Sequence, residues 1–408
     1  KDFSGAETEY QKYLQEDAQN NPALYGLGMA LAGQGKLDEA AAIVKRIQDA
    51  NLQTEVAAVL AFESQRSDAR QEIARAAAQS KYAQVLLARL NVMEKKYDEV
   101  VQQLANLSAG QFTFAYQYAE AIQALGQSYY HLNKFTEAKS AFSSLGLMSV
   151  AGCQDFAQAY NKEIVRKLDD TRREQIHAAA QRISEKIKEQ ESQPETTDGW
   201  TSRPLTFFIL PVEAGRSRYA VESGLVDLLP TALGDELDVK TSMNLVDREI
   251  ISDILAEQEL SALVGSKEGQ IQLGRVLGSR IILNFSFNTA GGKERVLVKA
   301  TNVETTERIP VSAVDVPAGA TPESLVTSLA ESVWQGVHQE FPLQGRLYAV
   351  DNSPEMNIGA EAGVTPGKTF LIYDDPAAPP IAEAQAIVRE EVGANSARLL
   401  LKGVEVAK

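Results

Sequence analysis

Residues 362 to 369, with the sequence AGVTPGKT, come nearest to a reaction site in residue type and spacing. A Gly-rich loop ending in Lys and Thr can hold a nucleotide phosphate, provided that a strand precedes it and a helix follows it. Here TFLIYDD follows, which favours a strand, and Pro366 removes one backbone amide from the loop. We therefore expect a turn between strands, with nucleotide binding as an alternative.

Charged residues in a second stretch, NLVDREIISDILAEQELS at 244 to 261, are the other candidates for chemistry. Asp247, Arg248, Glu249 and Glu257 have no nucleophile or histidine nearby in sequence that would make a catalytic set. Asp247 can instead accept N–H groups at a helix start, and Glu249 suits the positive end of the helix dipole. We expect helix capping, no catalytic residue and no enzymatic activity.

The chain has few residues that could serve metal or thiol chemistry. Cys153 is the only cysteine, so it forms no intramolecular disulfide and no thiol cluster. His177 lies among charged residues on a predicted helix, where a lone histidine is usually solvated. We expect no cofactor and no metal.

The composition favours some classes of protein over others. A chain of 408 residues with 44% hydrophobic residues is expected to hold about two to four domains with real cores. A net charge of −15, with Lys and Arg evenly scattered, argues against nucleic acid as a partner. No apolar run reaches the ~18 residues of a transmembrane helix.

The apolar residues of residues 1 to 150 have helical spacing, and the pattern repeats along the chain. The segments at 22 to 47, 81 to 107 and 121 to 145 each place a Leu followed by Gly or Ala early in one helix and aromatic or apolar residues in the next. They resemble tetratricopeptide repeats of ~34 residues, in which small residues let two helices approach. Residues 54 to 78 are expected to form a degenerate pair, and the opening DFSGAETEYQKYL to be the second helix of a truncated repeat. We expect three to four repeats.

Repeats of this type stack into a curved solenoid whose concave face is lined by the first helix of each pair. Such a groove binds an extended or helical peptide. The resemblance thus implies a protein partner. The side chains that we expect to bind it are Tyr25, Met29, Gln84, Gln123, Gln127 and Tyr130. For each of them, ordinary packing is the alternative.

Residues 151 to 192 are expected to form a long capping and spacer helix, and residues 193 to 203 an interdomain linker. From Phe156 to Ile187 apolar residues recur every three or four positions, with a gap at Arg172, between charged flanks. Pairing of two such stripes in a coiled coil is an alternative, compatible with a homo-oligomer. The linker is polar and contains Pro194 and Gly199.

Residues 204 to 341 alternate strands and helices in a way that predicts a mixed sheet with helices against it. The strand TFFILPVE at 206 to 213 is followed by a helix from about 218 to 237, which Pro230 should kink or break. A helix that ends at Gly278 precedes the strand at 280 to 288, a Gly turn and a second strand. A closing helix spans residues 321 to 340.

This order of motifs, with VDR and an ILAEQEL run before LGSRIIL, resembles the curli-assembly (CsgG-like) family. The resemblance implies an α/β domain of a periplasmic or outer-membrane-associated assembly accessory. Pore-forming members build a barrel from hairpins long enough to cross a bilayer. The short turn at 289 to 293 offers no such hairpin, so we expect a member that forms no pore.

Residues 342 to 408 alternate short strands with Gly and Pro turns, as in a small all-β, SH3-like barrel. The motifs NIG at 357 to 359, GVTPGKTFLIY at 363 to 373 and SARLLL at 396 to 401 resemble the C-terminal module of the flagellar assembly protein T family. That family also carries a curli-type middle region, so the two resemblances support each other.

Together, the patterns predict a multidomain chain of an all-α TPR solenoid, a CsgG-like α/β domain and a small SH3-like barrel. We expect a non-enzymatic scaffold that is periplasmic or associated with the outer membrane, and a lipid tether on the precursor is compatible with it. A cytoplasmic repeat scaffold with only a fold-level likeness to curli proteins is the alternative. A signal peptide ahead of Lys1 would favour export.

Overall fold

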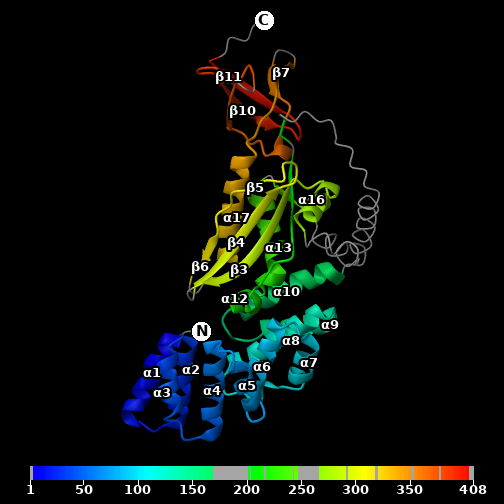
Figure 1. The fold of residues 1–408 in the computed structure, drawn as a ribbon. Helices are drawn as coiled ribbons and strands as arrows, with labels where there is room; N and C mark the ends of the chain where they lie inside the picture. Colours follow the sequence, from blue (N-terminus) through cyan, green and yellow to red (C-terminus); the bar gives the residue numbers. More distant parts are fainter. Residues whose placement is uncertain are drawn as a thin grey trace. The chain divides into compact units, whose positions relative to one another are not determined.

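The computed structural model describes residues 3–168, 201–202, 204–215, 217–241, 243–246, 266–290, 293–317, 320–350, 353–375 and 378–403. The chain divides into two compact units, Lys1–Asp170 and Thr171–Lys408 (Figure 1). We call the first the helical unit and the second the sheet unit. The predicted order of a helical region before a sheet-rich region is confirmed.

The helical unit consists of consecutive α-helices joined by turns, with the 3-10 helix η1 (Ala109–Gln111) in the longer connection between α7 and α8. Four pairs, α2/α3, α4/α5, α6/α7 and α8/α9, lie between α1 and α10, and the pair predicted at 54 to 78 corresponds to α4 and α5. The first helix of each pair contacts the first helix of the next. The bounds are α1 (Phe3–Glu16), α2 (Asn21–Gly33), α3 (Leu37–Val44), α4 (Ala50–Ser64), α5 (Ala69–Ala76), α6 (Lys81–Met93), α7 (Tyr97–Leu104), α8 (Ala115–His131), α9 (Phe135–Gly146) and α10 (Cys153–Leu168).

The same types of residue recur at the starts of the helices. The side chains of Asn20, Asp49 and Ser80 accept backbone N–H groups at the starts of α2, α4 and α6. The second helices start instead with acidic residues in the first turn, such as Asp38 in α3 and Asp98 in α7, which suit the positive end of the helix dipole.

The turn inside each pair contains one residue with a left-handed backbone. The four residues are Gly35, Gln65, Lys95 and Asn133, with φ of 75°, 51°, 60° and 58°. A left-handed residue ends a helix and reverses the chain. Only the first is a glycine, so the turn conformation repeats although its sequence does not.

Glycine at the helix crossings allows the close approach that the repeat pattern predicts. A Cβ atom on Gly28 would lie 2.8 Å from Cγ1 of Val56, and one on Gly126 would lie 2.7 Å from Cε1 of Phe142. Both distances are too short for real contacts, so a larger residue would force the helices apart.

The sheet unit contains a mixed sheet of order β2-β1-β3-β4-β5, with β6 also paired to β4. Strand β1 is parallel to β2 and β3, and the remaining pairs are antiparallel. The bounds are β1 (Leu205–Ile209), β2 (Met243–Leu245), β3 (Ile281–Ala290), β4 (Lys293–Asn302), β5 (Arg308–Ile309) and β6 (Val314–Val316). The described helices are α12 (Arg218–Glu222), α13 (Leu225–Lys240), α16 (Lys267–Val276) and α17 (Pro322–Glu340).

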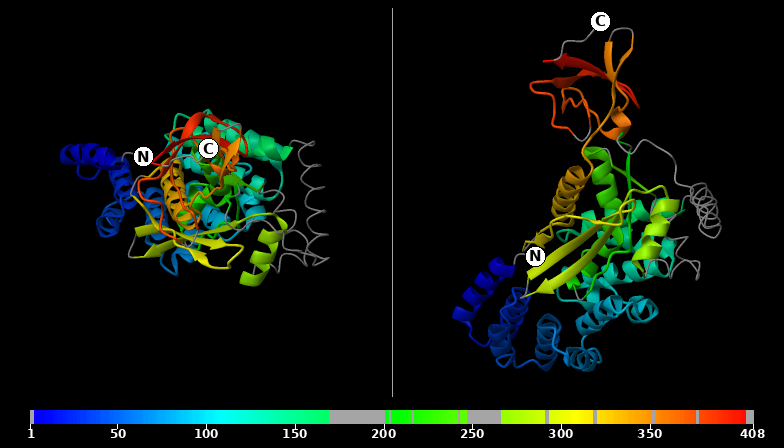
Figure 2. Two further views of the ribbon diagram at one scale, coloured as in Figure 1. Left: turned by 90° about the horizontal axis from the view of Figure 1, so that it is seen from above. Right: turned by 45° about the horizontal axis from the view of Figure 1, so that its top comes forward.

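Helices α13 and α17 cover one face of this sheet (Figure 2). Leu229 and Val333 from these helices share a buried core with Phe207 and Phe285 of the strands. The predicted helix at 218 to 237 is interrupted, but not at Pro230. A break at Pro230 is therefore the wrong half of the prediction, and a kink there stays a prediction. The break lies at Gly224, whose φ of 72° ends α12 and precedes α13, and Pro230 lies within α13.

The C-terminal part forms a curled antiparallel sheet of order β7-β8-β11-β10-β9. Its strands are β7 (Leu347–Val350), β8 (Ser353–Met356), β9 (Thr369–Leu371), β10 (Gln385–Val392) and β11 (Ala397–Lys402). Residues such as Met356, Val388 and Leu399 form a small core. The specific fold names predicted for both parts of the sheet unit stay predictions.

The loop at residues 362 to 369 is the turn that the sequence predicts. Gly363 and Gly367 have φ of 92° and 80°, and strand β9, not a helix, follows. The amide of Gly367 donates to the carbonyl of Val388, and the amide of Val388 donates to the carbonyl of Lys368, both at 2.9 Å. The loop backbone is thus engaged with β10.

We expect Gly126→Val to lower the free energy of unfolding of the helical unit by about 1 to 3 kcal/mol, because the new side chain overlaps the ring of Phe142. Chemical denaturation of the full chain measures the change. Gly110→Ala is the matched control, since a Cβ there meets no atom within 4 Å. Equal stability of the two variants would contradict the close crossing of α8 and α9.

Candidate protein-binding surface of the helical unit

Four of the six residues predicted to bind a partner are buried in helix packing. Tyr25, Met29, Gln127 and Tyr130 are 2%, 5%, 4% and 6% exposed. Gln84 and Gln123, on α6 and α8, are half-buried. The six side chains therefore do not form one exposed surface. Gln84 and Gln123 are the members that a partner could touch directly, and their role in binding stays a prediction.

Helix α10 explains the burial at the end of the repeats. Gln127 donates from Nε2 to the hydroxyl of Tyr160 at 3.2 Å. The ring of Tyr130 meets Tyr160 edge to face at 5.4 Å, and Phe142 stacks on Tyr160 at 4.4 Å. Tyr160 of α10 thus covers the apolar face that α8 and α9 leave open, as expected of a capping helix.

A polar junction joins the first helices of all four pairs. It consists of Tyr25, Glu55, Ser80 and Gln117, and we call it the Glu55 junction. The carboxylate of Glu55 on α4 accepts hydrogen bonds from the Tyr25 hydroxyl, from Oγ of Ser80 at 2.8 Å and from Nε2 of Gln117 at 3.0 Å. Nε2 of Gln117 also donates to the Tyr25 hydroxyl at 3.0 Å.

Gln117 has both ends of its amide engaged. Its Oε1 accepts the backbone N–H groups of Thr113 and Phe114, each at 3.1 Å, which fixes the chain at the start of α8. Because Gln117 and Tyr25 are 92 positions apart, this bond brings the first and the fourth pair together. A buried amide with all its groups bonded specifies one geometry.

A row of aromatic rings lies next to the Glu55 junction. Tyr25 stacks on Phe114 with ring centroids 5.6 Å apart, and Phe114 stacks on Tyr116 at 5.5 Å. Tyr116 in turn meets Tyr82 of α6 edge to face at 6.1 Å. Phe114 and Tyr116 are half-buried, so the row has edges accessible to solvent.

A nearly buried ion pair extends the polar contacts between α6 and α8. Glu120 accepts from Nη1 of Arg89 at 2.6 Å and from the hydroxyl of Tyr82 at 2.9 Å. The side chains of Arg89 and Glu120 are 14% and 12% exposed, and the guanidinium also lies 4.6 Å from the ring centre of Phe62. Replacing only one residue of such a pair is costly, because the other charge stays largely buried without its partner.

Burial and neighbouring carboxylates hold three tyrosines, one in the Glu55 junction and two in the adjacent aromatic row, in their neutral form. Burial raises the pKa of Tyr25 far above its ordinary value, and the charge of Glu55 adds to the rise. Burial likewise raises the pKa of Tyr82 and Tyr116, with the charge of Glu120 as the next cause in both. These hydroxyls serve as hydrogen-bond donors rather than as acids.

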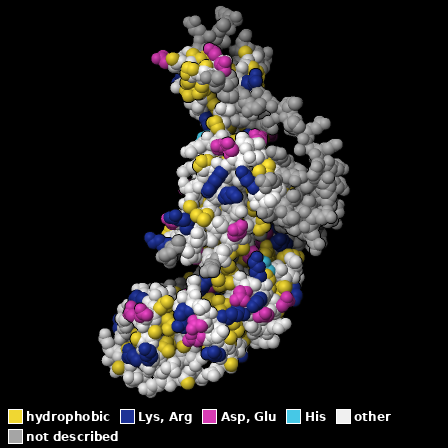
Figure 3. Space-filling model, in the orientation of Figure 1, with side chains coloured by type: hydrophobic (Ala, Val, Ile, Leu, Met, Phe, Trp, Pro, Cys, Tyr) yellow, Lys and Arg dark blue, Asp and Glu magenta, His cyan; other side chains and the backbone are white. Residues whose placement is uncertain are grey.

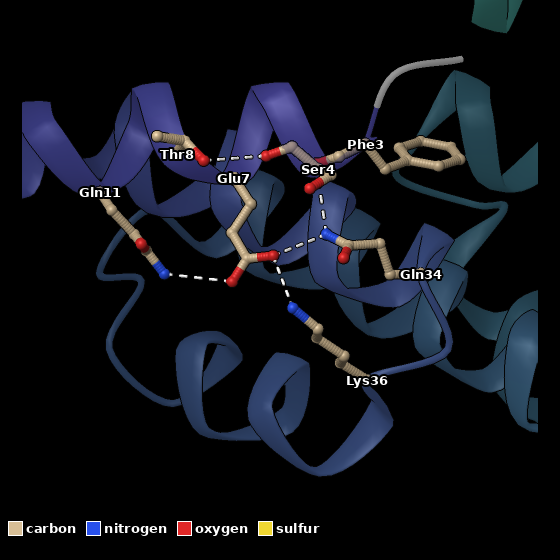
Figure 4. A network of polar contacts seen from close by, with 7 residues as sticks. All are labelled: Phe3, Ser4, Glu7, Thr8, Gln11, Gln34 and Lys36. Atoms are coloured by element: carbon tan, nitrogen blue, oxygen red, sulfur yellow. Dashed lines mark hydrogen bonds and ion pairs between the residues drawn. The ribbon is translucent and has the colours of Figure 1, made fainter.

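Helix α1 is fastened to the turn between α2 and α3 by a second polar network (Figure 4). Glu7 accepts from Nζ of Lys36 at 2.7 Å and from Nε2 of Gln34 at 2.8 Å. Nε2 of Gln34 also donates to the carbonyl of Phe3 at 3.2 Å. The hydrogen bond from Lys36 is the main cause that lowers the pKa of Glu7.

The remaining sequence candidates for chemistry lie in parts of the chain that the structure does not describe. Asp247, Arg248, Glu249, Glu257 and His177 lie outside the described residues. Within the described ranges, no group of three or more His, Cys, Asp and Glu side chains could hold a metal ion. In the same ranges, no helix has the length and apolar character needed to span a membrane.

Sequence reasoning missed Glu55, Ser80 and Gln117. Glu55 lies in the Ala-rich pair that matches the repeat pattern least well, and its partners are 25 and 62 positions away. The one available signal was Ser80, since a Ser before an apolar helix is typical of an N-cap.

We expect Tyr25, Tyr82 and Tyr116 to resist ionisation until the helical unit unfolds. Unfolded tyrosines have a pKa of about 10. The folded unit retains these protons above that pH, so the free energy of unfolding should fall as the pH rises beyond it. Ultraviolet titration of tyrosinate in the full chain measures the ionisation. These three tyrosines should ionise in a late phase that coincides with unfolding.

A single variant assigns the late phase of that titration. Tyr116→Phe should remove one group from the late phase, because burial and the charge of Glu120 raise the pKa of this tyrosine. A single early phase that contains all tyrosines would show that the junction does not exclude water.

Residues 1–61 match the tetratricopeptide repeat family. No curated protein and no solved structure matches the chain. The resemblance of residues 204 to 341 to curli-assembly proteins, and of residues 342 to 408 to flagellar assembly protein T, stays a prediction. The family match together with the stacked helix pairs fits a tetratricopeptide repeat domain at the N-terminus of the chain.

Proposed function

We propose that the protein is a non-enzymatic scaffold that binds a protein partner through its helical repeats. The observation that carries this proposal is the stack of four helix pairs whose first part matches the tetratricopeptide repeat family. Repeat arrays of this kind present an extended surface and typically recognise other proteins.

The Glu55 junction supports this function by fixing the curvature of the array. Hydrogen bonds from the fourth pair to the first and second pairs hold the helices in one arrangement before any partner arrives. A preformed surface loses less conformational entropy on binding than a mobile one. The half-buried rings of Phe114 and Tyr116 and the half-buried Gln84 and Gln123 are the contacts that such a surface offers.

We propose further that the scaffold serves assembly in the cell envelope, where it is periplasmic or associated with the outer membrane. What supports this location is the resemblance of residues 204 to 341 to the curli-assembly family and of residues 342 to 408 to flagellar assembly protein T. A mixed sheet covered by α13 and α17 and a separate curled sheet are compatible with both resemblances. A lipid tether and self-association fit the same role.

A photo-reactive amino acid placed at position 84 or 123 of the full chain tests partner binding in the cells that make it. Both positions should capture the same protein, because α6 and α8 contact each other. Position 139, an exposed lysine on the second helix α9, is the matched control and should not capture it.

Two outcomes would contradict the scaffold. One is the absence of any adduct at positions 84 and 123. The other is an identical set of adducts at all three positions, which would indicate unspecific contact.

A further inference from the structure

We propose that the outer face of β3, β4 and β5 binds an acidic segment of a protein partner. We call this surface the basic strand face and define it by Arg295, Leu297, Lys299 and Arg308 with Asn284 and Asn288. It belongs to the sheet unit and does not depend on what the repeats bind.

Strand geometry places these side chains together. Along β4, Val296, Val298 and Ala300 are buried against the helix-covered core, so Arg295, Leu297 and Lys299 lie on the opposite face. The three residues are exposed, and Leu297 is 40% exposed although it is apolar.

The pairing of β4 with β3 and β5 places polar side chains beside the cations. Asn288 pairs with Arg295 and Asn284 with Lys299 across β3 and β4. On the other side of β4, Arg308 of β5 pairs with Thr301. Figure 3 shows Lys and Arg side chains grouped over these strands of the sheet unit.

The charge of this face is opposite to that of the chain. The protein has a net charge of −15, yet the basic strand face carries three cations. Asp315 of β6 bonds to Arg295. Within the described part of the chain, Lys299 and Arg308 make no ion pair. A partner can therefore neutralise two charges that the described residues leave open.

The pattern of the face favours an acidic protein segment over a phosphate polymer or an anionic membrane. Binding to a phosphate backbone uses many clustered cations, whereas this face carries three, of which Arg295 is already paired with Asp315. Guanidinium pairs well with carboxylate, and Asn side chains both donate and accept, as a peptide backbone requires. The exposed Leu297 offers an apolar contact that suits a peptide side chain.

Fluorescence anisotropy of a labelled peptide of Glu with interspersed Leu, titrated with the full chain, tests the proposal. The double variant Lys299→Glu, Arg308→Glu should weaken binding by about tenfold or more, because both open cations become repulsive. The same affinity should fall as salt is raised.

The matched control is the double variant Arg389→Glu, Lys402→Glu, which makes the same change of charge at exposed residues of β10 and β11. It should bind the peptide like the parent chain. Thermal unfolding of both variants verifies that they are folded, and a misfolded double variant is replaced by Lys299→Glu alone.

Three results would overturn the proposal. The first is no saturable binding by the parent chain, and the second is an equal loss in the control variant. The third is tighter binding of single-stranded DNA or of vesicles with phosphatidylglycerol through Lys299 and Arg308, which would assign the face to a phosphate ligand.

Discussion

The carboxylate of Glu55 holds the first helices of the repeat array in one arrangement. A helix pair in a solenoid normally contacts only its neighbours, and it buries its second face only when another pair stacks on it. Here Gln117 of α8 reaches both Glu55 of α4 and Tyr25 of α2. The curvature of the array is therefore fixed by a contact beyond nearest neighbours, and Tyr160 of α10 closes its end.

A fixed array and an independent sheet unit suggest a protein that works through its surfaces. The repeats offer a preformed set of partly exposed aromatic and amide groups, which reduces the entropy lost on binding. The sheet unit adds a face whose cations oppose the net charge of the chain. Two surfaces of different chemistry are what a scaffold needs to join different partners.

The helices and strands could be predicted from local sequence patterns. The Glu55 junction could not, because it depends on contacts between residues that are distant in sequence. Small residues such as Gly28 and Gly126 mark helix crossings because only they fit there. Gln127 and Tyr130 are buried because α10 covers them, which fits packing, the alternative to partner binding. Spacing within α8 alone cannot decide between the two. The Glu55 junction joins residues up to 92 positions apart, so only the curvature of the array brings them together.

Hydrogen exchange of the full chain with Glu55→Ala tests most directly whether the junction unites the array. The variant leaves Gln117, Tyr25 and Ser80 without their shared acceptor, so amides of α2, α6 and α8 should lose protection together, by about 1 to 3 kcal/mol. Helix α17 should not change, and neither should any helix in the control Glu9→Ala, at a surface ion pair. A loss of protection confined to α4 would contradict the account.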